Sequence, residues 1–268
     1  MFKVVFTAGD PGWSTPLPAA HSERIDVTLF ERVSLDELRD ETTEVGEFGT
    51  LRAAYGAAHR WPLDAHGSDL DRYDEDLRST YILARDRSGS LLAGQRATAL
   101  RTTVAETLSM SMWQHAVERE SVAAQLARQY FRVREIDELA ERGLVWDLTR
   151  MLTTQSVDPR ATERKDLLLA QAALVDTFRV VGARAGSGSL LITVVTPEAK
   201  RFLDRLMPDN EVLLRGSIGP EEPESFLLTM RVDDSHQAQL ADARDRIERL
   251  LDRVDPAGAA RPPAPAAT

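Results

Sequence analysis

Two consecutive strand-like segments, joined by a short polar turn, constrain the fold of this chain more than any other stretch. The segments are Ser79–Asp86 and Leu91–Arg101, and the turn between them is Arg87-Ser88-Gly89-Ser90. A glycine in a short polar turn between two such runs is typical of a β-hairpin. The sequence therefore predicts an antiparallel strand pair here, and the other predicted elements are arranged around it.

Helices and further strands are expected before and after the hairpin. Ser34 and Glu37 form a capping-box pattern that predicts a helix start, and Gly143 is placed to end a long charged helix. Further predicted helices cover 48–59, 104–142, 163–181, 198–206 and 237–254, and further predicted strands cover 25–33, 145–152, 190–195, 211–218 and 225–232. This order predicts an α/β protein with a mixed, mostly antiparallel sheet, and not the strict βαβ alternation of a doubly wound fold.

Composition defines the expected domain limits and excludes several kinds of site. Residues 1–24 are rich in Pro, Gly and Ser and are expected to form an irregular arm, 25–254 a single domain, and 255–268 a disordered Ala/Pro-rich tail. Cysteine is absent, which excludes disulfides, zinc–thiolate sites and cysteine nucleophiles. No apolar run reaches the roughly 18 residues that a membrane span needs, so we expect a cytoplasmic protein.

The net charge of −10 restricts the possible partners. Nucleic acid is disfavoured, because binding to its backbone requires a basic face. A cationic small molecule suits an acidic chain, whereas an acidic protein partner would need a local basic patch. The five histidines show no metal-ligand spacing, so no metal site is expected.

A series of short motifs follows in a fixed order between Leu51 and Met230. They are Arg52, Trp61, Asp71 with Asp74 after Tyr73, Tyr81-Ile82-Leu83-Ala84-Arg85, Gly94-Gln95-Arg96, Trp146-Asp147-Leu148-Thr149-Arg150, and Ile192-Thr193-Val194-Val195-Thr196 before a helix with Lys200, Arg201 and Arg205. In this order they resemble the acyl-homoserine-lactone (autoinducer) synthases, the LuxI-type branch of the GNAT-like acyltransferases. The chain departs from the family pattern at Asp147, where the family has Glu, at Thr149, where it has Ser, and near Gly56, where it has Phe.

The resemblance implies a GNAT-like three-layer fold, in which helices flank the central sheet, and an acyltransferase activity. The amine of S-adenosylmethionine, a cosubstrate, would attack an acyl thioester on acyl carrier protein or coenzyme A. The methionine carboxylate would then close onto its own γ-carbon, which gives an acyl-homoserine lactone, a quorum-sensing signal, and methylthioadenosine. No other cofactor is implied.

The resemblance also assigns roles to individual residues. Arg52, Trp61, Asp71 and Asp74 would bind S-adenosylmethionine, and the catalytic charged network would consist of Arg96, Asp147 and Arg150. Carboxylates suit a sulfonium and an ammonium, and arginine suits a carboxylate. The candidate acyl-chain pocket comprises Met110, Trp113, Leu148, Thr149, Thr193 and Val194, and the candidate basic patch for a carrier protein comprises Arg164, Lys165, Lys200 and Arg201.

Simpler interpretations of the same residues remain open. Asp71 and Asp74 are also typical turn residues, and the pocket and patch residues are also typical of core and solvated surface. Asp147 and Arg150 fall on opposite faces of a regular strand, so each can serve in a structural ion pair, for example Asp147 with Arg96. The whole chain is also compatible with an acyltransferase for another amine, or with an inactive relative that binds a partner through its helix at 117–142 or 237–254.

Overall fold

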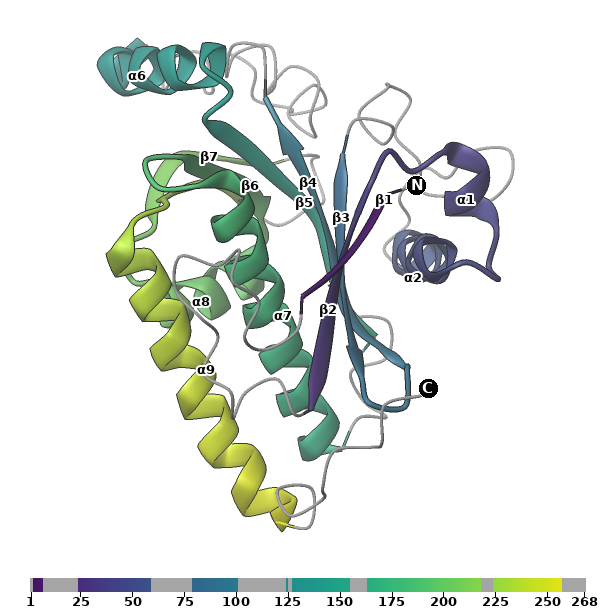
Figure 1. The fold of residues 1–268 in the computed structure, drawn as a ribbon. Coiled ribbons are helices and arrows are strands. Elements are labelled where there is room, and N and C mark those ends of the chain that lie inside the picture. The colour runs from purple at the N-terminus through teal and green to yellow at the C-terminus, as the bar shows by residue number, and fades with distance from the viewer. Residues whose placement is uncertain are drawn as a thin grey trace. The chain divides into compact units, whose positions relative to one another are not determined.

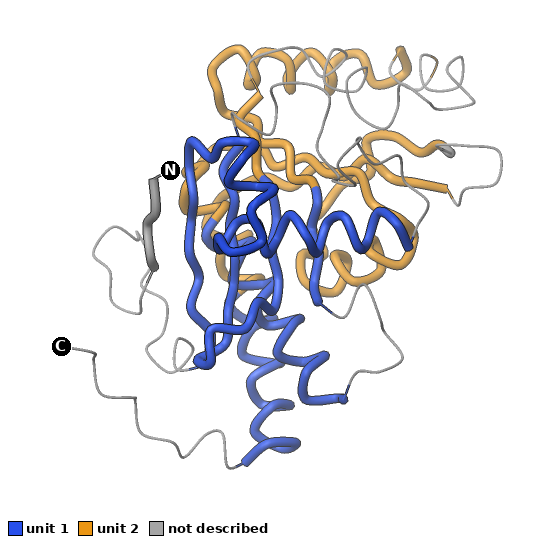
Figure 2. Tube along the Cα trace, turned by 90° about the vertical axis from the view of Figure 1, so that its right-hand side faces the viewer, with its two compact units in different colours: residues 1–96, 150–180, 241–268 blue, residues 97–149, 181–240 orange. Residues whose placement is uncertain are grey.

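The structure is a computed structural model, and it describes residues 2–6, 24–58, 79–100, 124, 127–154, 163–217 and 224–256. The chain forms two compact units, which Figure 2 colours blue and orange. Unit 1 comprises Met1–Arg96, Arg150–Val180 and Ala241–Thr268, and unit 2 comprises Ala97–Thr149 and Val181–Leu240. The single domain expected over 25–254 stays a prediction.

The strands of unit 1 follow the order β1 (Phe2–Phe6), β2 (Ile25–Glu31), β3 (Thr80–Asp86) and β4 (Leu91–Ala99), the last of which lies in this unit as far as Arg96. β2 is antiparallel to both β1 and β3. The expected hairpin between β3 and β4 is confirmed, since the Asp86 N–H donates to the Ser90 carbonyl over 3.0 Å. The irregular arm expected over 1–24 is wrong for residues 2–6, which pair with β2. The Pro, Gly and Ser residues that predicted the arm all lie after this segment, at 9–22.

Two helices of unit 1, α1 (Leu35–Arg39) and α2 (Glu44–Ala58), lie on one side of β2 and β3 (Figure 1). The predicted capping box at Ser34 and Glu37 is confirmed. Helix α2 begins four residues before the predicted start at 48, in a stretch that contains Gly46 and Gly49. A Cβ atom at these glycines would lie 1.8 and 2.2 Å from carbonyl oxygens of Asp40 and Leu38. The glycines therefore let α2 pack against the backbone of α1 and its C-cap, which offsets their low helix propensity.

Unit 1 also holds the greater part of two long helices, α7 (Arg164–Ala185) and α9 (Asp234–Val254), on the other side of β2 and β3 (Figure 1). Its core on the α2 side is a cluster of buried apolar residues: Phe30, Val33, Leu38, Val45, Phe48, Tyr81, Leu83, Leu91 and Leu152. The strands thus lie between helices on both faces.

The sheet of unit 2 has the strand order β4, β5 (Val145–Thr153), β6 (Leu190–Val195), β8 (Glu224–Arg231) and β7 (Glu211–Ser217). β5 and β6 are parallel, whereas β8 is antiparallel to both β6 and β7. The sheet is therefore mixed and mostly antiparallel, as predicted. β6 is deeply buried at Leu190, Leu191 and Ile192, each of which is about 1% exposed or less.

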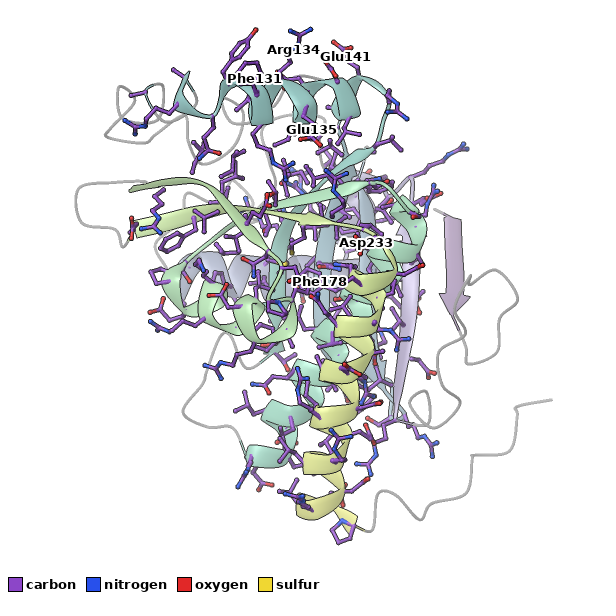
Figure 3. The ribbon with its side chains drawn as sticks, turned by 90° about the vertical axis from the view of Figure 1, so that its left-hand side faces the viewer. Phe131, Arg134, Glu135, Glu141, Phe178 and Asp233 are labelled. Atoms are coloured by element: carbon purple, nitrogen blue, oxygen red, sulfur yellow. The ribbon has the colours of Figure 1, made fainter. Side chains whose placement is uncertain are left out.

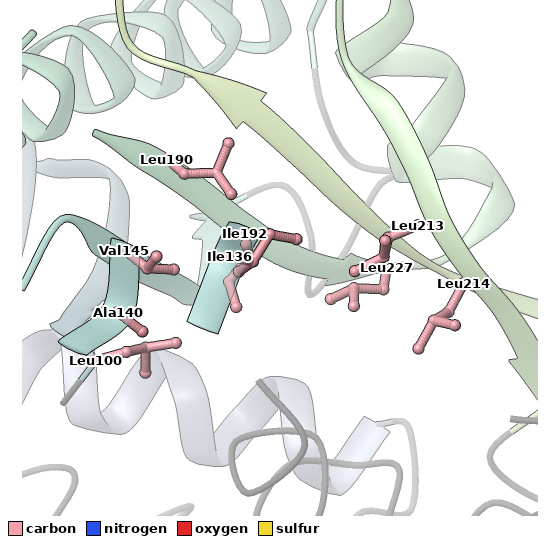
Figure 4. Close-up of a cluster of buried hydrophobic side chains, with 9 residues drawn as sticks. All are labelled: Leu100, Ile136, Ala140, Val145, Leu190, Ile192, Leu213, Leu214 and Leu227. Atoms are coloured by element: carbon pink, nitrogen blue, oxygen red, sulfur yellow. The ribbon is translucent and has the colours of Figure 1, made fainter. Parts of the chain in front are cut away.

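Helices α6 (Tyr130–Glu141) and α8 (Pro197–Leu206) complete unit 2. Gly143 ends α6 as predicted, with a φ of +71° and with hydrogen bonds from the N–H groups of Gly143 and Leu144 to carbonyls of Ala140 and Leu139, which is a Schellman motif. Ile136 and Ala140 of α6 join a buried cluster (Figure 4) whose other members are Leu100, Val145, Leu190, Ile192, Leu213, Leu214 and Leu227. Among the described helices, none has the length and apolar character that crossing a membrane requires.

Candidate active site

A close contact between α2 and β4 fixes which side of unit 1 carries the motif arginines. Gly94 on β4 has no side chain, and a Cβ atom there would lie 2.6 Å from ring atoms of Phe48 on α2. The same ring meets Tyr81 of β3 edge-on, with 6.4 Å between the ring centroids. Gly94 thus lets α2 lie directly on the strands. Because alternate residues of a strand share a face, Arg96 lies on the face that α2 covers.

Arg52 and Arg96 face the same layer of unit 1. Arg52 lies one turn beyond Phe48 on the same face of α2, and Arg96 lies two residues beyond Gly94 on the face of β4 that α2 covers. Arg85, near the end of β3, donates to the Glu44 carbonyl over 3.2 Å at the start of α2. Figure 1 shows α2 end-on, so the helix crosses the strands at a steep angle.

Both arginines are buried, with exposed fractions of 0% for Arg52 and 3% for Arg96. Each has at least one interaction partner. A buried guanidinium requires an anion or several acceptor groups, because desolvation otherwise opposes its charge. The layer between α2 and β4 is thus suited to hold carboxylates. The expected carboxylates Asp71 and Asp74 lie outside the described residues, as does Trp61.

Strands β5 and β6 part within unit 2. Their parallel register runs over three residue pairs, from Val145↔Leu190 to Asp147↔Ile192, although β6 continues to Val195. Just beyond the last pair, the Thr193 hydroxyl donates to the Leu148 carbonyl over 2.8 Å. A side chain therefore satisfies a buried backbone acceptor at the point where strand pairing ends. Asp147, the acidic residue of the Trp-Asp-Leu-Thr-Arg motif, is the last residue of β5 that pairs with β6.

The two faces of β5 differ in exposure. Trp146 is 8% exposed and Leu148 is fully buried, and the guanidinium carbon of Arg184 lies 5.8 Å from the Trp146 ring centroid. Trp146 is therefore a core residue. Asp147 and Thr149 are half-buried and share a face with Val145, which belongs to the cluster under α6. The polar residues Asp147 and Thr149 thus lie next to the apolar cluster under α6, at the place where β5 and β6 separate.

Arg150 adopts a left-handed backbone conformation, with a φ of +54°, although β5 continues to Thr153. A non-glycine residue in this region of φ costs on the order of 1 kcal/mol. The regular alternation of side chains along β5 holds only as far as Thr149. The expectation that Asp147 and Arg150 point to opposite faces assumed a regular strand. Because the strand is irregular at Arg150, the alternation rule no longer predicts the face on which Arg150 lies.

The candidate acyl-pocket residues that the structure describes fall on different faces. Leu148 and Thr149 alternate along β5, and Thr193 and Val194 alternate along β6. Val194 packs against the cluster that contains Ile136 and Ile192, whereas Thr193 is fully buried. Thr149 and Val194 therefore share the face toward α6, and Leu148 and Thr193 share the other. Met110 and Trp113 lie outside the described residues.

The expected basic patch consists mostly of ion-paired side chains. Lys165 of α7 pairs with Asp255 over 2.8 Å in unit 1. In unit 2, Lys200 pairs with Asp204 over 2.7 Å and Arg201 pairs with Glu198 over 3.1 Å, both on α8. Arg164 is exposed at the start of α7. Since these acids neutralise most of the charge locally, the surface of α8 offers little excess positive charge to an acidic protein.

A buried network of charges in unit 1 was not singled out from the sequence. Arg244 of α9 is fully buried, lies 3.0 Å from a carboxylate oxygen of Asp176 on α7 and also pairs with Glu248. Arg24 connects Glu248 over 3.0 Å to Asp252 over 2.8 Å. These charges interrupt the apolar stripes of the predicted helices at 163–181 and 237–254, and that interruption was the available signal. The network joins α7, α9 and the residue before β2, and it contains no motif residue.

The described residues contain one hollow away from all of the motif residues. It is open to solvent, lies in unit 2 and is lined by Met207, Asp209, Asn210, Met230, Arg231, Asp233, Ser235, His236 and Gln239. Burial lowers the pKa of His236, and the nearby Asp233 carboxylate opposes that shift. Within the described ranges, no group of three or more His, Cys, Asp or Glu side chains is placed to hold a metal ion.

Solved structures with a similar fold include three of acyl-homoserine lactone synthases. The CoA-dependent synthase BjaI with SAM and isopentyl-CoA has a TM-score of 0.50 and 15% identity, with 81% of this chain and 88% of that chain covered. BjaI with MTA gives a TM-score of 0.50, 16% identity and coverage of 81% and 88%. The synthase LasI gives 0.47 and 16%, with coverage of 81% and 94%. No family model matches the sequence, and no curated protein sequence matches it.

The two BjaI comparisons carry the conclusion about the fold. At this level of identity they establish a common fold over most of both chains. The α/β fold with a mixed, mostly antiparallel sheet between helices, which the motif resemblance implied, is therefore confirmed.

Proposed function

We propose that the chain is an acyl-homoserine lactone synthase that transfers an acyl group from a thioester to the amine of S-adenosylmethionine. The observation that carries the proposal is the coincidence of motif and geometry at β5. The acidic motif residue Asp147 is the last residue paired between β5 and β6, and the motif Thr149 and Arg150 follow where the pairing has ended. The fold shared with BjaI, whose solved structures contain SAM and isopentyl-CoA or MTA, supports the same assignment.

The reaction would proceed in two steps. The S-adenosylmethionine nitrogen forms an amide bond with the acyl carbonyl, the carbon–sulfur bond of the thioester breaks, and the thiol leaves. The methionine carboxylate then forms the lactone bond to the γ-carbon, the γ-carbon–sulfonium bond breaks, and methylthioadenosine leaves neutral. The first step requires a group that takes a proton from the ammonium, directly or through a water molecule. We assign this role to the half-buried Asp147 carboxylate.

The parted strands suit the acyl thioester. Two parallel strands that separate leave main-chain donors and acceptors that are not used between them, and an extended thioester chain can take the place of a strand there. Thr149 and Val194, on the face toward α6, are our candidates for contact with the acyl group. Met110 and Trp113 stay predicted members of the pocket.

The arginine layer suits the carboxylate of S-adenosylmethionine or the loop that binds it. Arg52 and Arg96 provide two buried guanidinium groups in one layer, and Asp71 and Asp74 stay the predicted partners for the sulfonium and ammonium. Trp61 stays a predicted cover of the pocket. We propose no cofactor besides this cosubstrate.

We favour acyl-CoA over an acyl carrier protein as the donor. The ion pairs of Lys165, Lys200 and Arg201 leave a weak basic surface for an acidic carrier. The BjaI synthase, which shares the fold, is described as CoA-dependent. Since both proposed substrates are intracellular metabolites, we also propose that the reaction takes place in the cytoplasm.

The direct test supplies purified protein with S-adenosylmethionine and a panel of acyl-CoA thioesters of different chain length. We expect thiol release, methylthioadenosine and one acyl-homoserine lactone, each measured by mass spectrometry. Asp147→Asn should lower turnover by about 100-fold, the lower range for loss of a general base, with the thermal midpoint retained. A matched control is Asp86→Asn in the hairpin turn, which should leave turnover unchanged. Thiol release without methylthioadenosine would show that the acyl acceptor is an amine other than S-adenosylmethionine.

A second candidate function is transfer of an acyl group to a different amine by the same fold. The replacement of the family's Glu by Asp147 and the Gly56 at a position expected to hold Phe favour it. Mass spectrometry of lipid extracts from a host that expresses the chain, compared with an Arg96→Ala variant, separates the two. An N-acyl amine other than a homoserine lactone, present only with the unaltered chain, would select this second function.

A further inference from the structure

The outward face of α6 combines an apolar ring with charges of both signs. Phe131 is 84% exposed, the side chains of Arg134 and Glu138 are each 63% exposed, and Glu141 is exposed. Figure 3 shows Phe131, Arg134 and Glu141 pointing away from the strands of unit 2, with Glu135 on the opposite side. Their spacing of three, four and three residues is that of a heptad seam. We call these four residues, Phe131, Arg134, Glu138 and Glu141, the α6 seam.

The other side of α6 is held firmly by unit 2. Ile136 and Ala140 are fully buried in the apolar cluster. Arg132 pairs with Glu211 over 2.6 Å, and Glu135 pairs with Arg231 over 2.8 Å. The helix therefore presents the seam from a fixed position.

The charges of the seam are arranged against the helix dipole. The first turn of α6 holds no acidic residue and the last turn no basic one, while Arg134 precedes Glu138 and Glu141 along the helix. Acidic groups near the N-terminus and basic groups near the C-terminus would stabilise an isolated helix. Arg134 and Glu138 also pair with each other over 3.1 Å within the helix, but such an exposed pair contributes little. Neither this pair nor the helix dipole explains the exposed Phe131, and a departure from local preference is a mark of a functional surface.

We propose that the α6 seam is the contact surface of a homodimer in which two copies of α6 pack antiparallel about a twofold axis. With the axis level with Ile136, Arg134 faces Glu138 of the partner subunit, and the same pair recurs on the other side of the axis. Phe131 then covers the methylene groups of the partner's Glu141, and Tyr130 faces the guanidinium of the partner's Arg142. Each charge of the seam meets an opposite charge or a ring.

Other kinds of binding partner complement the charges of only half of the α6 seam. An anionic membrane or an acidic protein suits Phe131 and Arg134 but is repelled by Glu138 and Glu141. A basic protein suits the acidic half alone. A second copy in the opposite direction satisfies both halves at once, since in a twofold contact one patch is its own complement. The net charge of −10 opposes contacts elsewhere between two copies.

The expected dimer is weak. The 12 residues of α6 span about 18 Å, and contacts between single helices fall in the class of weak encounters that bury less than roughly 1,200 Å². Self-association should therefore appear only at high protein concentration. It does not depend on the enzymatic function proposed above.

The test uses two variants with reversed charges, Arg134→Glu and Glu138→Arg, in sedimentation velocity over a concentration series. The unaltered chain should show a sedimentation coefficient that rises with concentration. Each variant alone should stay monomeric, because like charges then face each other across the axis. An equimolar mixture of the two variants should associate again, since the first variant is acidic at both positions, the second is basic at both, and opposite charges then meet across the contact.

Matched controls separate this contact from general charge effects. Reversal of the exposed pair on α8, as Arg201→Glu and Glu198→Arg, should leave self-association unchanged. Phe131→Ser should abolish association while its circular dichroism spectrum and thermal midpoint stay those of the unaltered chain. A monomer at every concentration, or a mixture of variants that does not associate, would overturn the proposal. Binding of a monomeric chain to anionic vesicles through Phe131 would overturn it in favour of a membrane surface.

Discussion

The network around Arg244 in unit 1 and the α6 surface in unit 2 are both chains of alternating charges, but they differ in their contact with water. Arg244 is fully buried between α7 and α9, whereas the side chains of Arg134 and Glu138 are each 63% exposed. Water screens an exposed pair and solvates either partner alone. A buried pair has no such alternative, so loss of one partner leaves an uncompensated charge. Burial, and not the number of ion pairs, should therefore decide what each network contributes to stability.

The largest effect is expected from Asp176→Asn, which removes the anion beside buried Arg244. Loss of one partner of a buried pair costs about 3–5 kcal/mol in the free energy of unfolding. Urea titration followed by circular dichroism measures it. The double variant Asp176→Leu with Arg244→Leu should recover only part of that loss, because the buried Arg179 also lies 4.0 Å from Asp176 and keeps its charge. A loss of unfolding free energy no larger than that for an exposed pair would contradict the idea that burial decides the contribution of each network.

An intermediate effect is expected from Arg24→Ala at the partly exposed end of the same network. The Arg24 side chain is 12% exposed and bonds to both Glu248 and Asp252. Hydrogen bonds between charged groups of this kind contribute roughly 2 kcal/mol, and both carboxylates keep some access to water. The urea midpoint should fall between those of Asp176→Asn and the unaltered chain. A loss as large as that of Asp176→Asn would show that position in the network matters more than exposure.

A smaller, pH-dependent effect is expected from His236 in unit 2, which is 4% exposed. Burial lowers the pKa of this imidazole below the value of 6.5 that applies in the unfolded chain. The unfolded state therefore binds more protons between the two pKa values, so stability should fall as the pH drops through 6.5. Thermal midpoints measured between pH 8 and pH 5 should decline less for His236→Gln than for the unaltered chain. Parallel curves would show that His236 is not the group responsible.

The smallest effect is expected from Arg134→Ala on α6. Arg134 donates a hydrogen bond to Glu138 over 3.1 Å at an exposed site, where such ion pairs contribute little to stability. The thermal midpoint at low protein concentration should not change measurably. A clear loss of stability under these conditions would show that the exposed network supports the fold as well.

The same contrast separates what the sequence could predict from what it could not. The hairpin, the capping box at Ser34 and the end of α6 at Gly143 rest on contacts within a few residues, and each was predicted. Strand β1 depends on pairing with β2, and the early start of α2 depends on Gly46 and Gly49 meeting the backbone of α1 and its C-cap. Neither leaves a periodic pattern in its own segment.

The candidate site divides in the same way. The motif order predicted that Arg52, Arg96 and Asp147 would be placed by α2, β4 and β5, and each lies on its expected element. The burial of both arginines follows from the contact between Gly94 and Phe48, which joins segments far apart in the sequence. The left-handed backbone at Arg150 has no sequence signal at all, because arginine is not a residue that prefers it. The predicted roles of these side chains in catalysis stay predictions.

The separation of β5 from β6 has a consequence for how such a protein can change over evolutionary time. The separation is a feature of the main chain, and a single hydroxyl, that of Thr193, bonds from one strand to the other just beyond the last paired residues. Substitutions of the surrounding side chains can reshape the volume beside the separation without closing it. The main-chain arrangement can therefore persist while the side chains around it are exchanged, and the fold shared with BjaI at only 15% identity is an example of such persistence.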